Sequence, residues 1–180
     1  GELWLSKRNA RLALSQGGGF VTVHDALDGH AGEPLFVGRG KRRAQITFAG
    51  ADGRSLAVAL EQSPVVTVWD LATRSPSRTL EGVDDVRSLR ASADGARLFA
   101  LDWAGSLVLW NLADGARSTR DVGPASTLRP HPTRPWLLVT GGSRSRATVF
   151  DVDRMDVVGE TPESRDTLAT FAGTDELLVV

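Results

Sequence analysis

The sequence contains no cysteine, which excludes a disulfide scaffold, a thiol nucleophile and any cysteine-ligated zinc site. No apolar run approaches the ~20 residues that a membrane-spanning helix needs, and no charged-then-apolar signal sequence opens the chain. Neither sign of charge dominates, because 21 basic residues face 22 acidic ones and the net charge is −1. That balance argues against a general polyanion binder. The 180 residues, 41% hydrophobic and 24% charged, are ordinary for one folded domain.

Methionine and lysine are almost absent as well. Met155 is the only methionine, so we do not expect residue 1 to be a natural translation start. Nineteen of the 21 basic residues are arginine, a bias that together with plentiful alanine and glycine is typical of a high-GC bacterial genome. We therefore expect a bacterial protein, and in the absence of a visible export signal we expect it in the cytoplasm.

The chain repeats itself with a period of about 40 residues. One marker is an alternating apolar strand that ends in an aromatic residue or histidine followed by an acid or amide. Its four copies are Val21-Thr22-Val23-His24-Asp25, Val66-Thr67-Val68-Trp69-Asp70, Leu107-Val108-Leu109-Trp110-Asn111 and Ala147-Thr148-Val149-Phe150-Asp151. A second marker, a polar turn before a short apolar strand, places leucines at positions 12, 56, 98, 137 and 177. Two independent markers with one period indicate a repeat architecture.

Each period is predicted to be β throughout. Short segments rich in valine, leucine and threonine alternate with Gly, Pro, Asp or Asn, and no stretch has a sustained helical stripe. One unit is predicted to have four strands, at 85–91, 97–101, 106–110 and 117–121, joined by turns at Asp94-Gly95, Ala104-Gly105 and Asp114-Gly115. Four antiparallel strands repeated every ~40 residues are typical of β-propeller blades. A single β-sandwich is the alternative, although it would not require a fixed period.

Residues 65–114 resemble the tryptophan-aspartate (WD) repeat propellers. The resemblance rests on Trp69-Asp70, on Ser92-Ala93-Asp94-Gly95 and on the Trp110-Asn111 variant. The period extends over nearly the whole chain, but the WD dipeptide is intact only once.

Several positions depart from the family pattern. Gly82-Val83 lacks the family's histidine, and Ser63 and Ala104 replace the aspartate of the turn before the WD strand. The hydrogen-bonded tetrad of typical blades is therefore missing, which leaves room for other propeller families, including lactonase-like ones.

The repeats predict an all-β fold, a β-propeller with about four and a half four-stranded blades. Because WD-like propellers usually have seven blades, we expect this chain to be an internal part of a larger ring that forms one partial domain. The predicted blades span 2–38, 44–81, 85–122 and 125–160, and a half blade spans 166–180.

No residues suggest catalysis, a cofactor or a metal. His24 occupies the tryptophan position of a strand and is expected to pack there, whereas His30 and His131 are expected in exposed turns, without metal-ligand spacing. Gln16-Gly17-Gly18-Gly19-Phe20 joins two predicted strands and leads into no helix, so it is interpreted as a hairpin turn rather than a phosphate loop. Asp151-Val152-Asp153 lacks the continuation of a calcium loop.

A partner surface is expected on the loops between blades and between second and third strands. The WD resemblance places seven residues there: Glu61, Asp102, Trp103, Arg144, Arg146 and, from the basic run 38–43, Arg42 and Arg43. Trp103 is the leading candidate because a large aromatic residue in a turn suits a binding hot spot. Packing against the neighbouring blade is its alternative role. Nucleic-acid binding by the basic run is not favoured, because no aromatic residues are interleaved with it.

The resemblance implies a non-enzymatic scaffold or sensor platform that binds protein partners, often fused in bacteria to a kinase, protease or NTP-hydrolysing domain. The alternative is a propeller enzyme of lactonase type, or a propeller that gates a fused peptidase.

Overall fold

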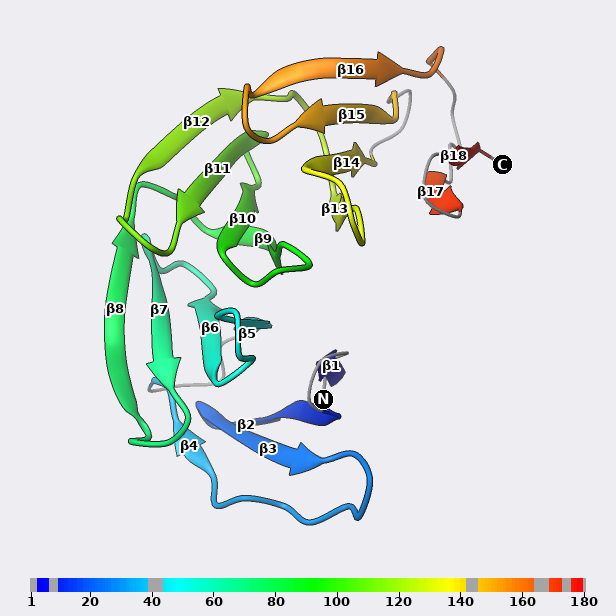
Figure 1. Ribbon diagram of the computed structural model, residues 1–180. Coiled ribbons are helices and arrows are strands. Elements are labelled where there is room, and N and C mark those ends of the chain that lie inside the picture. The colour runs from blue at the N-terminus through cyan, green and yellow to red at the C-terminus, as the bar shows by residue number, and fades with distance from the viewer. Residues whose placement is uncertain are drawn as a thin grey trace. The chain divides into compact units, whose positions relative to one another are not determined.

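The computed structural model describes residues 3–6, 10–38, 44–141, 146–163, 169–172 and 176–179. Over these residues the regular structure is entirely β-strand, arranged as four four-stranded sheets and one two-stranded sheet, all antiparallel (Figure 1). The described part of the chain has no helix long and apolar enough to cross a membrane. The predicted all-β fold of four-stranded blades with a further half blade is confirmed.

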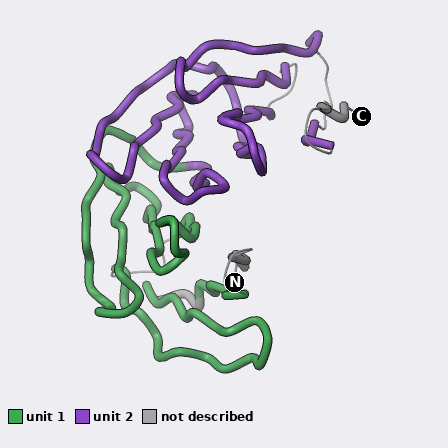
Figure 2. The backbone as a smooth tube through the Cα atoms, in the orientation of Figure 1, with its two compact units in different colours: residues 1–86 green, residues 87–180 purple. Residues whose placement is uncertain are grey.

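The chain divides into two compact units, residues 1–86 and 87–180 (Figure 2). The first unit contains two sheets, which we call blades 1 and 2, with strands in sequence order. Blade 1 consists of β1 (Leu3–Ser6), β2 (Arg11–Gly17), β3 (Phe20–Asp25) and β4 (Leu35–Phe36). Blade 2 consists of β5 (Ala44–Ala49), β6 (Ser55–Leu60), β7 (Val65–Asp70) and β8 (Ser75–Glu81).

The second unit contains blades 3 and 4 and a two-stranded sheet. Blade 3 consists of β9 (Val86–Ala91), which begins at the unit boundary, β10 (Arg97–Asp102), β11 (Ser106–Asn111) and β12 (Arg117–Asp121). Blade 4 consists of β13 (Thr127–Pro130), β14 (Trp136–Thr140), β15 (Thr148–Asp151) and β16 (Asp156–Glu160), and β17 (Ala169–Ala172) pairs with β18 (Glu176–Val179). The four strands predicted for blade 3 agree with β9–β12 to within one residue at each end.

Each unit has an apolar core built by strands of successive blades. In the first unit, Val21 from β3 packs in one buried cluster with Ile46 and Leu56 of blade 2. In the second unit, Phe99 and Leu107 of blade 3 share a cluster with Leu137 of blade 4. Alternation along a strand places every second side chain on one face of the sheet, so each blade buries apolar residues against its neighbour. The blades within one unit therefore stabilise each other.

The acid or amide that ends each third strand forms the turn to the fourth strand. Its side-chain oxygen accepts a backbone N–H from two residues later, at 2.7–2.9 Å. The four acceptors are Asp25, Asp70, Asn111 and Asp151. Asparagine serves as well as aspartate because the bond needs only an oxygen acceptor. This bond explains why the final position of the repeat keeps an acid or amide while the preceding aromatic position varies.

Asp70 makes this turn sensitive to acid. Backbone hydrogen bonds from Thr73 and Ala72 hold the pKa of its carboxyl below the usual 3.8. The unfolded chain therefore binds the proton more readily, and this contribution to stability is fully present above about pH 4 and is lost as the pH falls through the lowered folded pKa. We expect Asp70→Asn to flatten the acid limb of stability against pH, measured by denaturant unfolding at a series of pH values. An unchanged acid limb would contradict this role.

The histidines divide between the surface and the core. His30 is exposed and lies 3.2 Å from the Asp28 carboxylate, as expected for a turn residue. The prediction that His131 is exposed is wrong, because only 1% of the residue is accessible. Its Nδ1 accepts backbone N–H groups from Thr133 at 3.1 Å and Arg134 at 2.9 Å, so the ring closes the turn before β14. The hairpin at Gly18-Gly19 is confirmed, with φ of 63° and 83°.

Candidate functional site

Trp103 projects from the turn between β10 and β11 and is 64% exposed. The Arg87 guanidinium, from β9 of the same unit, lies over the indole ring with its Cζ 4.6 Å from the ring centroid. Arg87 also donates from Nη1 to the Ala125 carbonyl at 3.0 Å. A cation held over an indole restrains the ring without burying it. The result is an exposed aromatic side chain with a fixed orientation.

Asp102 stabilises this turn through a hydrogen bond to its backbone. The residue is only 6% exposed, and its Oδ1 accepts the Ser106 backbone N–H at 2.8 Å. Gly105, in the same turn, has a φ of 93° that glycine adopts without strain. The carboxylate of Asp102 is therefore occupied with shaping the loop that carries Trp103, and the neighbouring indole offers the accessible surface.

The other predicted partner residues lie in different surroundings. Arg146 pairs with two carboxylates of its own unit, Glu160 at 3.3 Å and Glu163 at 3.5 Å. Glu61 is exposed in the turn between β6 and β7. Arg42, Arg43 and Arg144 lie outside the described residues. Of the four that the structure describes, Trp103 has the most accessible apolar surface.

Arg87 was missed by the sequence reasoning. It is the third residue of the strand predicted at 85–91 and lies 16 positions before Trp103, so nothing in the local pattern joins the two. Only the register of blade 3 brings this side chain beside the turn.

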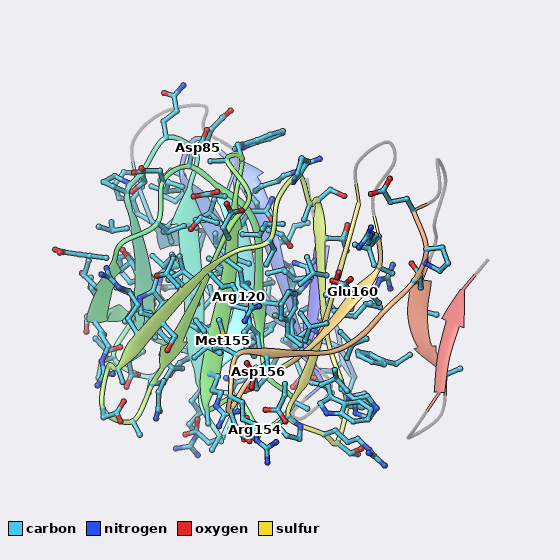
Figure 3. The ribbon with its side chains drawn as sticks, turned by 90° about the horizontal axis from the view of Figure 1, so that it is seen from above. Asp85, Arg120, Arg154, Met155, Asp156 and Glu160 are labelled. Carbon is cyan, nitrogen blue, oxygen red and sulfur yellow. The ribbon has the colours of Figure 1, made fainter. Side chains whose placement is uncertain are left out.

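Arginine side chains also tie blade 4 to blade 3 within the second unit. Arg120 of β12 donates to the Met155 carbonyl in the β15–β16 turn, and its guanidinium lies 5.4 Å from the Phe150 ring centroid (Figure 3). Arg97, the first residue of β10, forms an ion pair with Asp153 in the same turn. These contacts close the outer part of the junction between the two blades.

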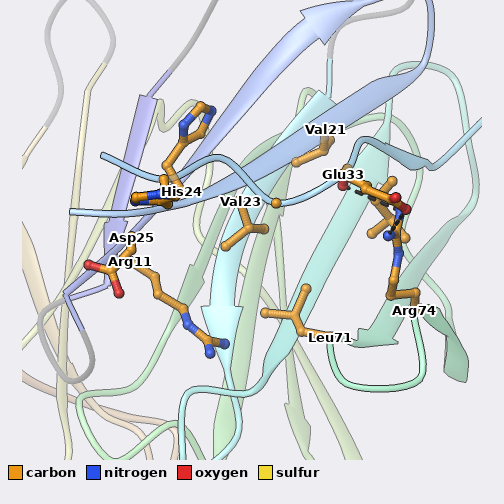
Figure 4. Close-up of a pocket in the computed structure, with 11 residues that line it drawn as sticks. Arg11, Val21, Val23, His24, Asp25, Glu33, Leu71 and Arg74 are labelled. Atoms are coloured by element: carbon orange, nitrogen blue, oxygen red, sulfur yellow. Dashed lines mark hydrogen bonds and ion pairs between the residues drawn. The ribbon is translucent and has the colours of Figure 1, made fainter. Parts of the chain in front are cut away.

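The corresponding junction in the first unit contains a cleft of about 280 Å³ (Figure 4). Its apolar lining comes from Val21, Val23 and Leu35 of blade 1 and Leu71 of blade 2. Gly32 and a set of polar and charged residues complete the wall, and the latter are Arg11, His24, Asp25, His30, Glu33 and Arg74. The Arg74 guanidinium donates to Glu33 Oε2 at 2.6 Å and to the Pro34 carbonyl at 2.8 Å, which anchors the long β3–β4 connection to blade 2.

Metal-ligating side chains do not gather in groups of three or more anywhere in the described part of the chain. The two acids of Asp151-Val152-Asp153 have separate structural tasks. Asp151 accepts backbone N–H groups of its own turn, and Asp153 pairs with Arg97. Both carboxylates are thus engaged by other groups of this chain.

Comparison with known proteins identifies the fold. No protein-family model and no curated protein matches the sequence. Among solved structures, the β-propeller domain of Cps50 (Swd1) from Myceliophteria thermophila is similar with a TM-score of 0.76 and 15% identity, over 98% of this chain and 60% of that one. Hydrazine synthase from Kuenenia stuttgartiensis is similar with a TM-score of 0.72 and 18% identity, over 92% of this chain and 49% of that one. The chain thus spans about half to three-fifths of the length of these structures, and the likeness shows that its blades have the β-propeller fold.

Proposed function

We propose that this chain is part of a WD-repeat-like propeller that serves as a non-enzymatic scaffold for protein partners, with Trp103 at the centre of one contact surface. The exposed, oriented indole is the observation that carries the proposal. Burying a tryptophan in an interface gains a large apolar area, and tryptophan and arginine are both enriched among hot-spot residues. Trp103 and Arg87 supply this pair on a single turn and its neighbouring strand.

The proposed mechanism is recognition by loops on a stiff β frame. Asp102 fixes the turn, and the Ala125 carbonyl fixes one edge of the Arg87 guanidinium. Because these groups are ordered before binding, this chain loses little conformational entropy when a partner binds. A partner that stacks an apolar group on Trp103 and accepts a hydrogen bond from the remaining guanidinium edge would fit the surface.

The proposal is tested by removing the indole. We expect Trp103→Ala to weaken the binding of a partner that the wild-type chain captures. The loss of binding free energy should be about 2 kcal/mol or more, roughly a 30-fold rise in the dissociation constant. The measurement is in-cell crosslinking followed by titration of the recovered partner against purified variants.

Leu27→Ala is the matched control, since Leu27 is an exposed apolar side chain in a turn of the first unit. Its affinity for the same partner should equal that of the wild type. Equal binding by wild type and Trp103→Ala, or equal losses in both variants, would contradict the proposed surface.

A further inference from the structure

Arg11 and Arg97 occupy the same position in their blades but differ in their partners. Each begins the second strand of its blade and pairs in register with the acid or amide that ends the third strand, Asp25 for Arg11 and Asn111 for Arg97. Arg97 forms an ion pair with Asp153, which lies two residues after Asp151 in the following blade. The residue two after Asp70 in blade 2 is Ala72. The carboxylate that would neutralise Arg11 by the same contact is therefore replaced by a methyl group.

The carboxylates that line the cleft are engaged elsewhere. Glu33 is paired with Arg74, and Asp25 Oδ1 accepts the Leu27 backbone N–H at 2.8 Å. In Figure 4 the Arg11 guanidinium extends toward Leu71, whereas the Asp25 carboxylate lies to the other side. Within the described residues no carboxylate forms an ion pair with Arg11. Its guanidinium is thus the cation of the cleft that no described carboxylate neutralises by such a pair.

A further difference between blades 1 and 3 lies in the fourth strand. It shortens from five residues in β12 to two in β4, which pairs only with Phe20 and Val21. Part of β3 is therefore covered by a loop instead of a strand, beside the apolar lining of the cleft.

We propose that this cleft binds a small organic carboxylate with a short aliphatic chain. The ligand's carboxylate accepts two hydrogen bonds from the Arg11 guanidinium, and its aliphatic chain lies against Val23 and Leu71. At about 280 Å³ the cleft is at the small end of ligand sites, which favours a compact acid over a larger ligand. This site is separate from the Trp103 surface and does not depend on the scaffold function.

The probe is 3-methylbutanoate, titrated into the isotopically labelled chain while amide shifts are followed by NMR. We expect saturable shifts at Val23, Gly32 and Leu71, and none with the isosteric neutral 3-methylbutanamide. Arg11→Met, which keeps the apolar stem, should weaken binding at least tenfold. Arg54→Met is the control, because Arg54 is exposed and lies near Asp52 instead; its affinity should be unchanged.

A second variant tests the site without removing Arg11. Ala72→Asp restores the carboxylate found at the Asp153 position, so it should pair with Arg11 and abolish binding of the probe. Ala113→Asp, at the same turn position in the second unit, should bind like the wild type. The proposal is overturned if the wild type does not bind the probe, if the neutral amide binds equally, or if Arg11→Met or Ala72→Asp retains wild-type affinity.

Discussion

Replacing Trp110 with alanine should lower the free energy of unfolding by about 3–5 kcal/mol, the range observed when a buried large aromatic side chain is truncated. Trp110 is only 2% exposed and lies opposite Leu98, which is fully buried in blade 3. The loss combines the transfer free energy of the indole with the cost of a cavity between strands that cannot collapse fully. Since small domains have total stabilities of about 5–15 kcal/mol, this one change removes a large share. Urea or guanidinium unfolding followed by circular dichroism measures it.

Trp103 provides an internal control in the same blade. It lies seven positions earlier and is mostly exposed, so Trp103→Ala should cost no more than about 1 kcal/mol, chiefly its cation–π contact with Arg87. Trp110→Phe should lose less than Trp110→Ala, because Phe150 fills the equivalent position in blade 4. Similar losses for Trp110→Ala and Trp103→Ala would refute the assignment of one tryptophan to the core and the other to the surface.

The repeat made the fold predictable because two local rules recur in every blade. Alternating apolar residues specify the strands, and an acid or amide oxygen closes the turn after the third strand, as Asp70 and Asn111 both do. Each rule acts over fewer than ten residues, so the sequence alone displays it. The aromatic position before this acid is less constrained, since blade 1 accepts His24 there.

The surroundings of side chains were less predictable, because they depend on contacts between distant residues. His131 lies between prolines in a turn-like sequence, yet it is buried, and its ring lies 4.6 Å from that of Phe171 in the next sheet. The pairing of Arg87 with Trp103 depends on the register of blade 3, and the difference between Arg11 and Arg97 depends on a residue in the following blade. Local periodicity contains none of this information, so the sequence could place Trp103 in a turn but could reveal neither its contact with Arg87 nor the cleft.

Gly105→Ala should destabilise the chain by about 2–4 kcal/mol, although it adds only one methyl group. Gly105 has a φ of 93°, where a non-glycine residue is strained by about 1–3 kcal/mol. An added Cβ would also lie 2.3 Å from the Gly123 carbonyl oxygen, and backbone cannot move aside as a flexible side chain can. The same close approach lets the Gly105 carbonyl accept the Val122 N–H at 2.9 Å, so relief of the clash would weaken this bond between the turn and the segment after β12.

Gly29→Ala separates the two causes of this loss. Gly29 also has a positive φ, 74°, but no atom lies within 4 Å of its added Cβ. Its cost should therefore be the backbone strain alone, about 1 kcal/mol. If Gly105→Ala costs no more than Gly29→Ala in denaturant unfolding, the packing of the turn against Gly123 is not tight, and the orientation of Trp103 would not be fixed by this contact. If it costs clearly more, the loop that carries the exposed indole is held by backbone packing as well as by Asp102, which is the rigidity that a preorganised binding surface requires.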